Sequence, residues 1–296
     1  MQHFISNSCG EIWMKKVRES NFELMRIISM IFIVLWHIIG RGLVIERSGN
    51  PAIATVFKML KYIIIVHVDS FIILMGYFQY KKKFKLSKVI SIVIQTLFYS
   101  VIIFFVLYIL GYFSDLNWTT LINIFIPFSS QDYWFIASYL ITYIFSDYIN
   151  LLIQNLNHNQ FKRLIIICFI VFSLIPFLTG MRFIENDGFN FYNFIFLYII
   201  GAYLHRYSLK NSHIFARTNI RLYRLLLIIM FFVCSTYSYF IYSFAYSNMY
   251  SGSLFNHISK VLICSQDSYA SPIVIIQTIC YFEFFKTLNV KSKIIN

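Results

Sequence analysis

Charged side chains are scarce in this sequence. Asp, Glu, Lys and Arg make up 12% of the 296 residues, about half the share found in soluble domains, so the chain has too few charges to cover a water-exposed surface. Instead, 59% of the residues are hydrophobic and 20% are aromatic. Continuous apolar runs of bilayer length recur along the whole chain, which predicts an all-α, polytopic membrane helix bundle.

Cysteine pairs and the motifs of soluble enzymes are also missing. The five cysteines (Cys9, Cys168, Cys234, Cys264 and Cys280) stand singly and form no CxxC, so neither a metal site nor a disulfide framework is expected. No GxSxG, HExxH or Gly-rich phosphate loop occurs. The net charge of +13 comes from clusters of Lys and Arg between apolar runs. Such clusters indicate membrane topology, and no nucleic-acid partner is expected.

Apolar runs and basic clusters together predict about eight transmembrane helices. Their approximate ranges are 23–45, 55–79, 88–112, 133–153, 163–179, 190–205, 222–246 and 270–288. Basic residues collect before the first span and in every second loop, which places both termini in the cytoplasm. Residues 1–296 are treated as one integral-membrane domain, with an N-terminal segment at 1–22, the bundle at 23–288 and a tail at 289–296.

The first span carries two polar side chains that are costly in a bilayer. Arg26 and His37 are eleven positions apart. This is about three helical turns, so both lie on one face, about 16 Å apart along the axis. An imidazole titrates near neutrality and can take a proton from a hydroxyl and return it to a leaving group. Both residues are candidates for catalysis. The simpler alternative is a structural role, in which each side chain only makes buried hydrogen bonds.

Asp69 is the only carboxylate deep inside a predicted span and is the third catalytic candidate. A buried carboxylate needs a cationic or hydrogen-bonding partner. Measured from the inner ends of spans one and two, Asp69 and His37 come to similar depths. We expect Asp69 to orient His37 or to pair with Arg26. A purely structural ion pair between the two helices fits the pattern equally well.

The densest basic cluster, residues 80–88, follows the second span. Its lysines are candidate ligands for the phosphates of a nucleotide-containing donor; they are Lys81, Lys82, Lys83 and Lys85. A topology signal beside anionic lipid is the alternative interpretation, and from the cluster alone it is the favoured one.

Taken together and in order, these segments resemble the bacterial acyltransferase-3 family. Ser20–His37 contains Arg-x10-His, and Val68–Phe78 (VDSFIILMGYF) is similar to the family's VDxFFxxSGYF. Pro127–Ile136 carries the PF and YWFI elements of a third family stretch. Phe194–Tyr203 and Ser271–Val274 also have family counterparts. The resemblance runs from about residue 20 to the end of the chain.

Members of this family are integral-membrane enzymes that acylate, and often O-acetylate, surface carbohydrates. The resemblance implies transfer of an acyl group, with acetyl as the expected one, from acyl-CoA to a hydroxyl of a cell-surface polysaccharide or lipid-linked sugar. By position, His37 is the family's essential histidine, acting as general base or acyl relay, and Arg26 is its partner in the motif. The lysine-rich loop matches the region thought to meet acyl-CoA. The implied location is the bacterial inner membrane.

Two departures from the family pattern leave alternatives open. Met75 stands where the family usually has Ser, and relatives usually continue past residues 291–296 into two further helices. An inactive, truncated acyltransferase is therefore one alternative. A transporter or flippase of polysaccharide intermediates is another, although only Pro176 of the four prolines lies inside a span, so helix breaks typical of carriers are few. A polysaccharide polymerase is less compatible with the short outer loops.

Overall fold

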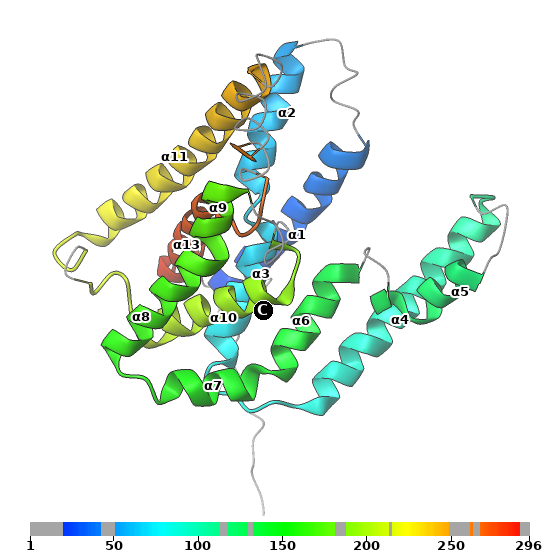
Figure 1. Ribbon diagram of the computed structural model, residues 1–296, viewed down its shortest axis with the longest axis horizontal. Coiled ribbons are helices and arrows are strands. Elements are labelled where there is room, and N and C mark those ends of the chain that lie inside the picture. The colour runs from blue at the N-terminus through cyan, green and yellow to red at the C-terminus, as the bar shows by residue number, and fades with distance from the viewer. Residues whose placement is uncertain are drawn as a thin grey trace, which may run out of the picture.

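The computed structural model describes residues 20–42, 51–112, 118–129, 133–180, 188–212, 215–248, 261–262 and 267–290 (Figure 1). The elements used below are α1 (Ser20–His37) with a π-helical continuation at Ile38–Gly42, α2 (Pro51–Ile64), α3 (His67–Gln79), α4 (Leu86–Ile109), α5 (Trp118–Phe125), α6 (Trp134–Ile144), α7 (Ser146–Gln154), α8 (His158–Phe169), a π-helical segment at Ile170–Leu174, α9 (Ile175–Thr179), α10 (Phe191–Arg206), α11 (Ile220–Ser247) and α13 (Pro272–Thr287). The all-α membrane bundle predicted from composition is confirmed.

Within the described ranges, five helical stretches are long and apolar enough to cross a membrane, and they are Ser20–Gly40, Ala52–Gln79, Leu86–Ile109, His158–Thr179 and Ile220–Ser247. A sixth is the pair α6 and α7, which bends by 51° where the two helices meet. The remaining two of the eight predicted spans are α10 and α13, each 16 residues long and mostly buried. Both are shorter than the five stretches above, and most of their side chains pack against protein.

Helices α3 and α10 form the centre of the bundle and cross at two glycines. A Cβ atom on Gly76 would lie 2.1 Å from the carbonyl oxygen of Tyr198. A Cβ atom on Gly201 would lie 2.2 Å from the carbonyl oxygen of Ile73. Both distances are far below van der Waals contact, so this close approach of two helix backbones requires glycine at both positions.

The second predicted span, 55–79, is interrupted in the middle. Ile65 and Val66 form a turn between α2 and α3, and His67 begins α3. Three polar residues lie in the protein interior in the first turn after the interruption: His67, Asp69 and Ser70 are all buried, within the same candidate span. The predicted location of Asp69 deep inside the membrane region is therefore consistent with the fold.

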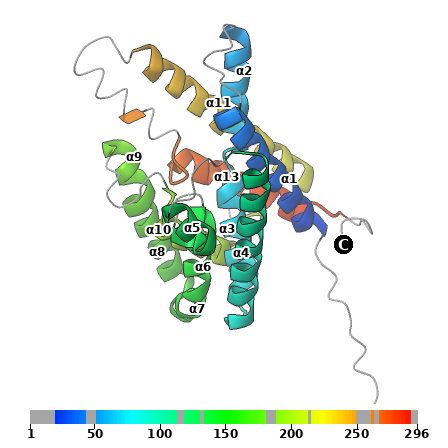
Figure 2. The same cartoon turned by 90° about the vertical axis from the view of Figure 1, so that its right-hand side faces the viewer.

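Helix α4 lies to one side of the core with α5 beside it (Figures 1 and 2). The loop that precedes it is held against α6 and α7. The backbone N–H of Phe84 donates to Asp147 Oδ1 at 2.7 Å, and that of Lys85 donates to the Tyr143 hydroxyl at 3.1 Å. These bonds fix the lysine-rich loop and the first turn of α4 at one end of the bundle.

Candidate functional site

The polar face of α1 contacts the rest of the bundle between Arg26 and His37. Ser29 is fully buried, and its Oγ lies 2.9 Å from Ser70 Oγ on α3 and 3.3 Å from the Tyr281 hydroxyl on α13. These contacts fix the rotation of α1 about its axis. The predicted polar stripe therefore faces protein at this level, and Arg26 and His37 belong to two separate places along it.

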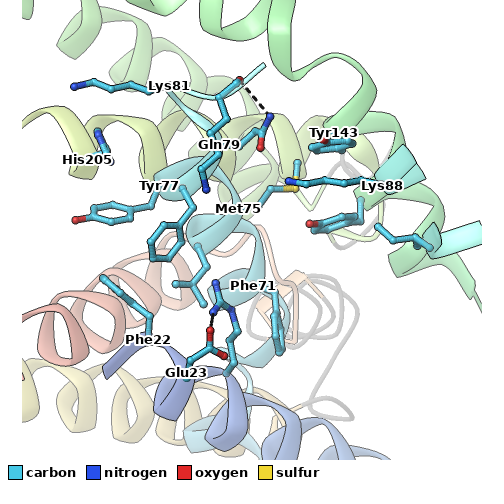
Figure 3. Close-up of a pocket in the computed structure, with 16 residues that line it drawn as sticks. Phe22, Glu23, Phe71, Met75, Tyr77, Gln79, Lys81, Lys88, Tyr143 and His205 are labelled. Atoms are coloured by element: carbon cyan, nitrogen blue, oxygen red, sulfur yellow. Dashed lines mark hydrogen bonds and ion pairs between the residues drawn. The ribbon is translucent and has the colours of Figure 1, made fainter. Parts of the chain in front are cut away.

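Arg26 lines a cavity of about 990 Å³ between α1, α3, α4, α6 and α10 (Figure 3). Its middle is apolar, with Phe71, Leu74 and Met75 from α3. In Figure 3, Glu23 and Lys81 lie toward opposite ends, and Lys88 lies across from His205. The Met75 thioether thus extends the apolar wall at the position where a hydroxyl was expected from the family pattern. We call this space the basic cavity because of the charges described next.

Of the residues that the structure describes, four cationic side chains and one carboxylate line the basic cavity. Arg26, Lys81, Lys82 and Lys88 are the cations, and Glu23 is the carboxylate. The ammonium of Lys82 lies 5.6 Å from the ring centre of Phe78, and that of Lys88 lies 5.4 Å from the ring centre of Tyr143. A cluster of several cations with a single counter-charge favours an anionic ligand.

The four lysines named from the sequence divide into two groups. Lys81 and Lys82 line the basic cavity, whereas Lys83 and Lys85 do not. Lys88 also lines it, because the first turn of α4 brings this lysine against Tyr143 of α6. From the sequence, Lys88 could not be distinguished from the other lysines of the cluster. The role of these lysines in donor binding stays a prediction.

Asp69 does not form the pair expected from the sequence. Arg26 Nη1 is 2.5 Å from Glu23 Oε1, one turn earlier on α1, and its guanidinium lies 5.4 Å from the ring centre of Phe78. Asp69 is fully buried, and within the described part of the chain neither of its oxygens has a hydrogen-bond partner. Arg26 pairs locally because residues three apart on a helix are neighbours. Asp69 also makes no hydrogen bond to His37.

His37 is at the other end of α1, outside the basic cavity. It is the last α-helical residue before the π-helical segment Ile38–Gly42, and its side chain is exposed. Short π-helical stretches often occur at functional positions. In this structure the segment follows the one titratable side chain that the sequence placed at the centre of the chemistry.

A second histidine, His67, is held in the interior near His37. Its Nδ1 lies 2.7 Å from the carbonyl oxygen of Ile64, so Nδ1 carries the proton and donates it. Its Nε2 then accepts from the Tyr269 hydroxyl at 3.3 Å. Trp36 packs against the His67 ring with 5.3 Å between ring centres, and His37 is the next residue after Trp36 on α1. We call Trp36, His37, His67 and Tyr269 the histidine cluster.

Tyr269 is rigidly placed by the loop that precedes α13. Ser173, in the π-helical segment after α8, donates to the carbonyl oxygen of Ala270 at 2.6 Å. Trp134 stacks on the Tyr269 ring at 5.9 Å between ring centres, and Phe189 meets the same ring edge-on at 5.4 Å. The chain has 22 tyrosines, and nothing in the sequence distinguished Tyr269 among them.

The fold and the site define a polytopic membrane protein with a cationic cavity at one end of a helix and a histidine cluster at the other. A family model described as an acyltransferase domain matches residues 19–282. The chain belongs to the acyltransferase-3 family, which confirms the resemblance seen in the sequence, and it is a multi-pass membrane acyltransferase. No curated protein and no solved structure matches it.

Proposed function

We propose that this chain transfers an acyl group, with acetyl as the expected one, from acyl-CoA to a hydroxyl of a surface polysaccharide or lipid-linked sugar in the bacterial inner membrane. The observation that carries the proposal is the pairing of a cationic cavity with a histidine on one helix. Arg26 lines the cavity, and His37 follows about 16 Å further along α1. An acyl-CoA has the matching polarity, with phosphates at one end and a thioester at the other.

The basic cavity suits the donor half of the reaction. Arginine and lysine bind phosphate oxygens through charge-assisted hydrogen bonds, and Arg26, Lys81, Lys82 and Lys88 supply them. The apolar wall of Phe71 and the neighbouring α3 residues suits an uncharged arm directed away from the phosphates. Glu23 pairs with the Arg26 guanidinium and holds it at the wall of the cavity.

The histidine cluster suits the transfer step. As general base, His37 removes the proton from the sugar hydroxyl while the oxygen of that hydroxyl attacks the thioester carbonyl. The carbon–sulfur bond then breaks, and the CoA sulfur takes the proton from the imidazolium. As acyl relay, a ring nitrogen of His37 attacks the thioester first, CoA leaves as the thiol, and the sugar hydroxyl takes the acyl group in a second step. Both routes keep His37 at the reacting carbonyl.

The experiment is made on the polysaccharide of the cell itself. The gene is deleted and restored as wild type, His37→Ala or His158→Ala, and O-acetyl signals are measured by proton NMR. His158 is an exposed residue at the start of α8 and is the matched control. We expect the signal to return with wild type and His158→Ala and to stay absent with His37→Ala, at equal protein levels in the membrane. A signal that returns with His37→Ala would exclude His37 from the chemistry.

A further inference from the structure

Two lysines lie in α2, one turn apart, in a helix that is otherwise apolar. Lys58 and Lys61 are near the start of the candidate span Ala52–Gln79, whereas the lysines of the basic cavity follow its other end. Figures 1 and 2 show the start of α2 at the same end of the molecule as the end of α11. A lysine inside a membrane span is costly unless a partner compensates its charge, so each of the two requires an explanation.

Lys61 has a counter-charge. Its Nζ lies 3.1 Å from Asp267 Oδ1, and the Tyr62 hydroxyl donates to the same oxygen at 3.2 Å. The two charged side chains are 29% and 34% exposed, so the pair is half-buried and still open to solvent on one side. The Lys61 ammonium also lies 5.1 Å from the ring centre of Trp36. Asp267 therefore neutralises one of the two lysines.

Lys58 has no counter-charge among the described residues. Its ammonium contacts two rings of α11, at 5.5 Å from the ring centre of Tyr242 and 4.9 Å from that of Tyr246. A ring face attracts a cation less strongly than a carboxylate does. The group of Lys58, Lys61 and Asp267 consequently carries one unbalanced positive charge.

Through Lys61, this group of charges lies close to the proposed chemistry. Trp36, which contacts Lys61, is the neighbour of His37 in the chain and packs against His67 in the histidine cluster. Around the two ammonium groups are three aromatic rings from α1 and α11. Aromatic faces with a few fixed polar groups are typical of sites that bind and orient a small molecule.

We propose that Lys58, together with Lys61 and the rings of Tyr242 and Tyr246, binds an oxyanion carried by the acceptor saccharide, either a carboxylate or a phosphate. The acceptor is then an acidic sugar, and the bound anion holds its hydroxyl beside His37. This assignment rests on the proposed function for the role of His37. A lipid headgroup would need neither the two rings of α11 against Lys58 nor a carboxylate beside the cations, and Asp267 limits the net charge that would attract it.

The test measures binding in the absence of an acyl donor. Wild type, Lys58→Met and Lys162→Met are placed in nanodiscs of phosphatidylcholine, and calorimetry compares two matched pairs of probes. These are hexagalacturonate with its methyl ester, and phosphorylated maltohexaose with maltohexaose. Lys162 is an exposed lysine of α8 and serves as the control. For at least one pair, we expect the acidic probe to bind more tightly than its neutral partner, and Lys58→Met to weaken that binding about fivefold or more, with Lys162→Met unchanged.

Three results would contradict the proposed oxyanion site. The first is equal affinity for the acidic and the neutral probe in both pairs, and the second is equal affinity of Lys58→Met and wild type for every acidic probe. The third is loss of the difference between Lys58→Met and wild type when phosphatidylglycerol is added to the nanodiscs. The last result would identify a lipid headgroup as the ligand. Because no acyl donor is present, the binding result is independent of transfer. A chain that binds the acidic probe but never restores O-acetyl signals keeps this site and loses the proposed function.

Discussion

The crossing of α3 and α10 predicts that two Gly→Ala substitutions change the stability of the protein in opposite directions. In Gly201→Ala, the new methyl group would lie 2.2 Å from the Ile73 carbonyl oxygen. Ordinary contact begins beyond 3.4 Å, and a backbone oxygen in a helix cannot rotate away, so the two helices must separate by about 1 Å. Overpacking of a core of this kind costs about 3 kcal/mol, the upper part of the usual range. At roughly 2 °C per kcal/mol for a chain of this size, the unfolding midpoint falls by about 6 °C.

Gly40→Ala is the matched control, since a Cβ atom at Gly40 has nothing within 4 Å. There the only effect expected is the higher helix propensity of alanine, which is worth up to about 1 kcal/mol in favour of the variant. The assay is thermal unfolding of both purified variants in the same detergent, followed by circular dichroism. A Gly201→Ala protein that unfolds at the same temperature as Gly40→Ala would refute the close crossing on which the position of α3, and of the side chains that it carries, depends.

Two further predictions concern the site. Lys88→Met should weaken binding of acetyl-CoA by about threefold to tenfold, because a partly exposed charged contact is worth on the order of 1 kcal/mol. Lys83→Met, the control, should leave the affinity unchanged. Equal affinities of the two variants in a fluorescence titration would contradict the assignment of Lys88 to the cavity. Tyr269→Phe keeps the ring but removes the hydrogen bond to His67 at 3.3 Å. It should lower kcat about threefold to tenfold at unchanged KM, and a kcat equal to that of wild type in steady-state assays would exclude a positioning role.

The sequence was sufficient for the fold class and for the general position of the polar face of α1. Helices that face lipid must be long and apolar and carry few charges, because the bilayer core contains no water. These properties can be read directly from the sequence. The short length and deep burial of α10 and α13 could not be read from it, because a helix packed against protein is as apolar as one that faces lipid. The break at Ile65 and Val66 was also hidden, since an apolar turn leaves no mark in hydropathy.

At the site, the spacing of residues along one helix allowed their positions to be predicted, whereas contacts between different helices could not be predicted from the sequence. Arg26 and His37 could be placed on one face of α1 from their separation alone. The partner of Arg26 is Glu23 on the same helix, and Asp69 forms neither of the bonds expected of it. Tyr269 lies 202 positions from His67 in the chain, and only the three-dimensional packing brings them together.

The central claim is that donor binding and chemistry belong to opposite ends of α1. It is tested most directly by equilibrium binding of acetyl-CoA to purified wild type, Arg26→Ala and His37→Ala. Loss of one charge-assisted contact at a partly exposed site is worth about 1.5 kcal/mol, or about tenfold in affinity. Arg26→Ala is expected to bind acetyl-CoA about tenfold more weakly, and His37→Ala, although inactive, is expected to bind it as wild type does. Wild-type affinity in Arg26→Ala would contradict the claim.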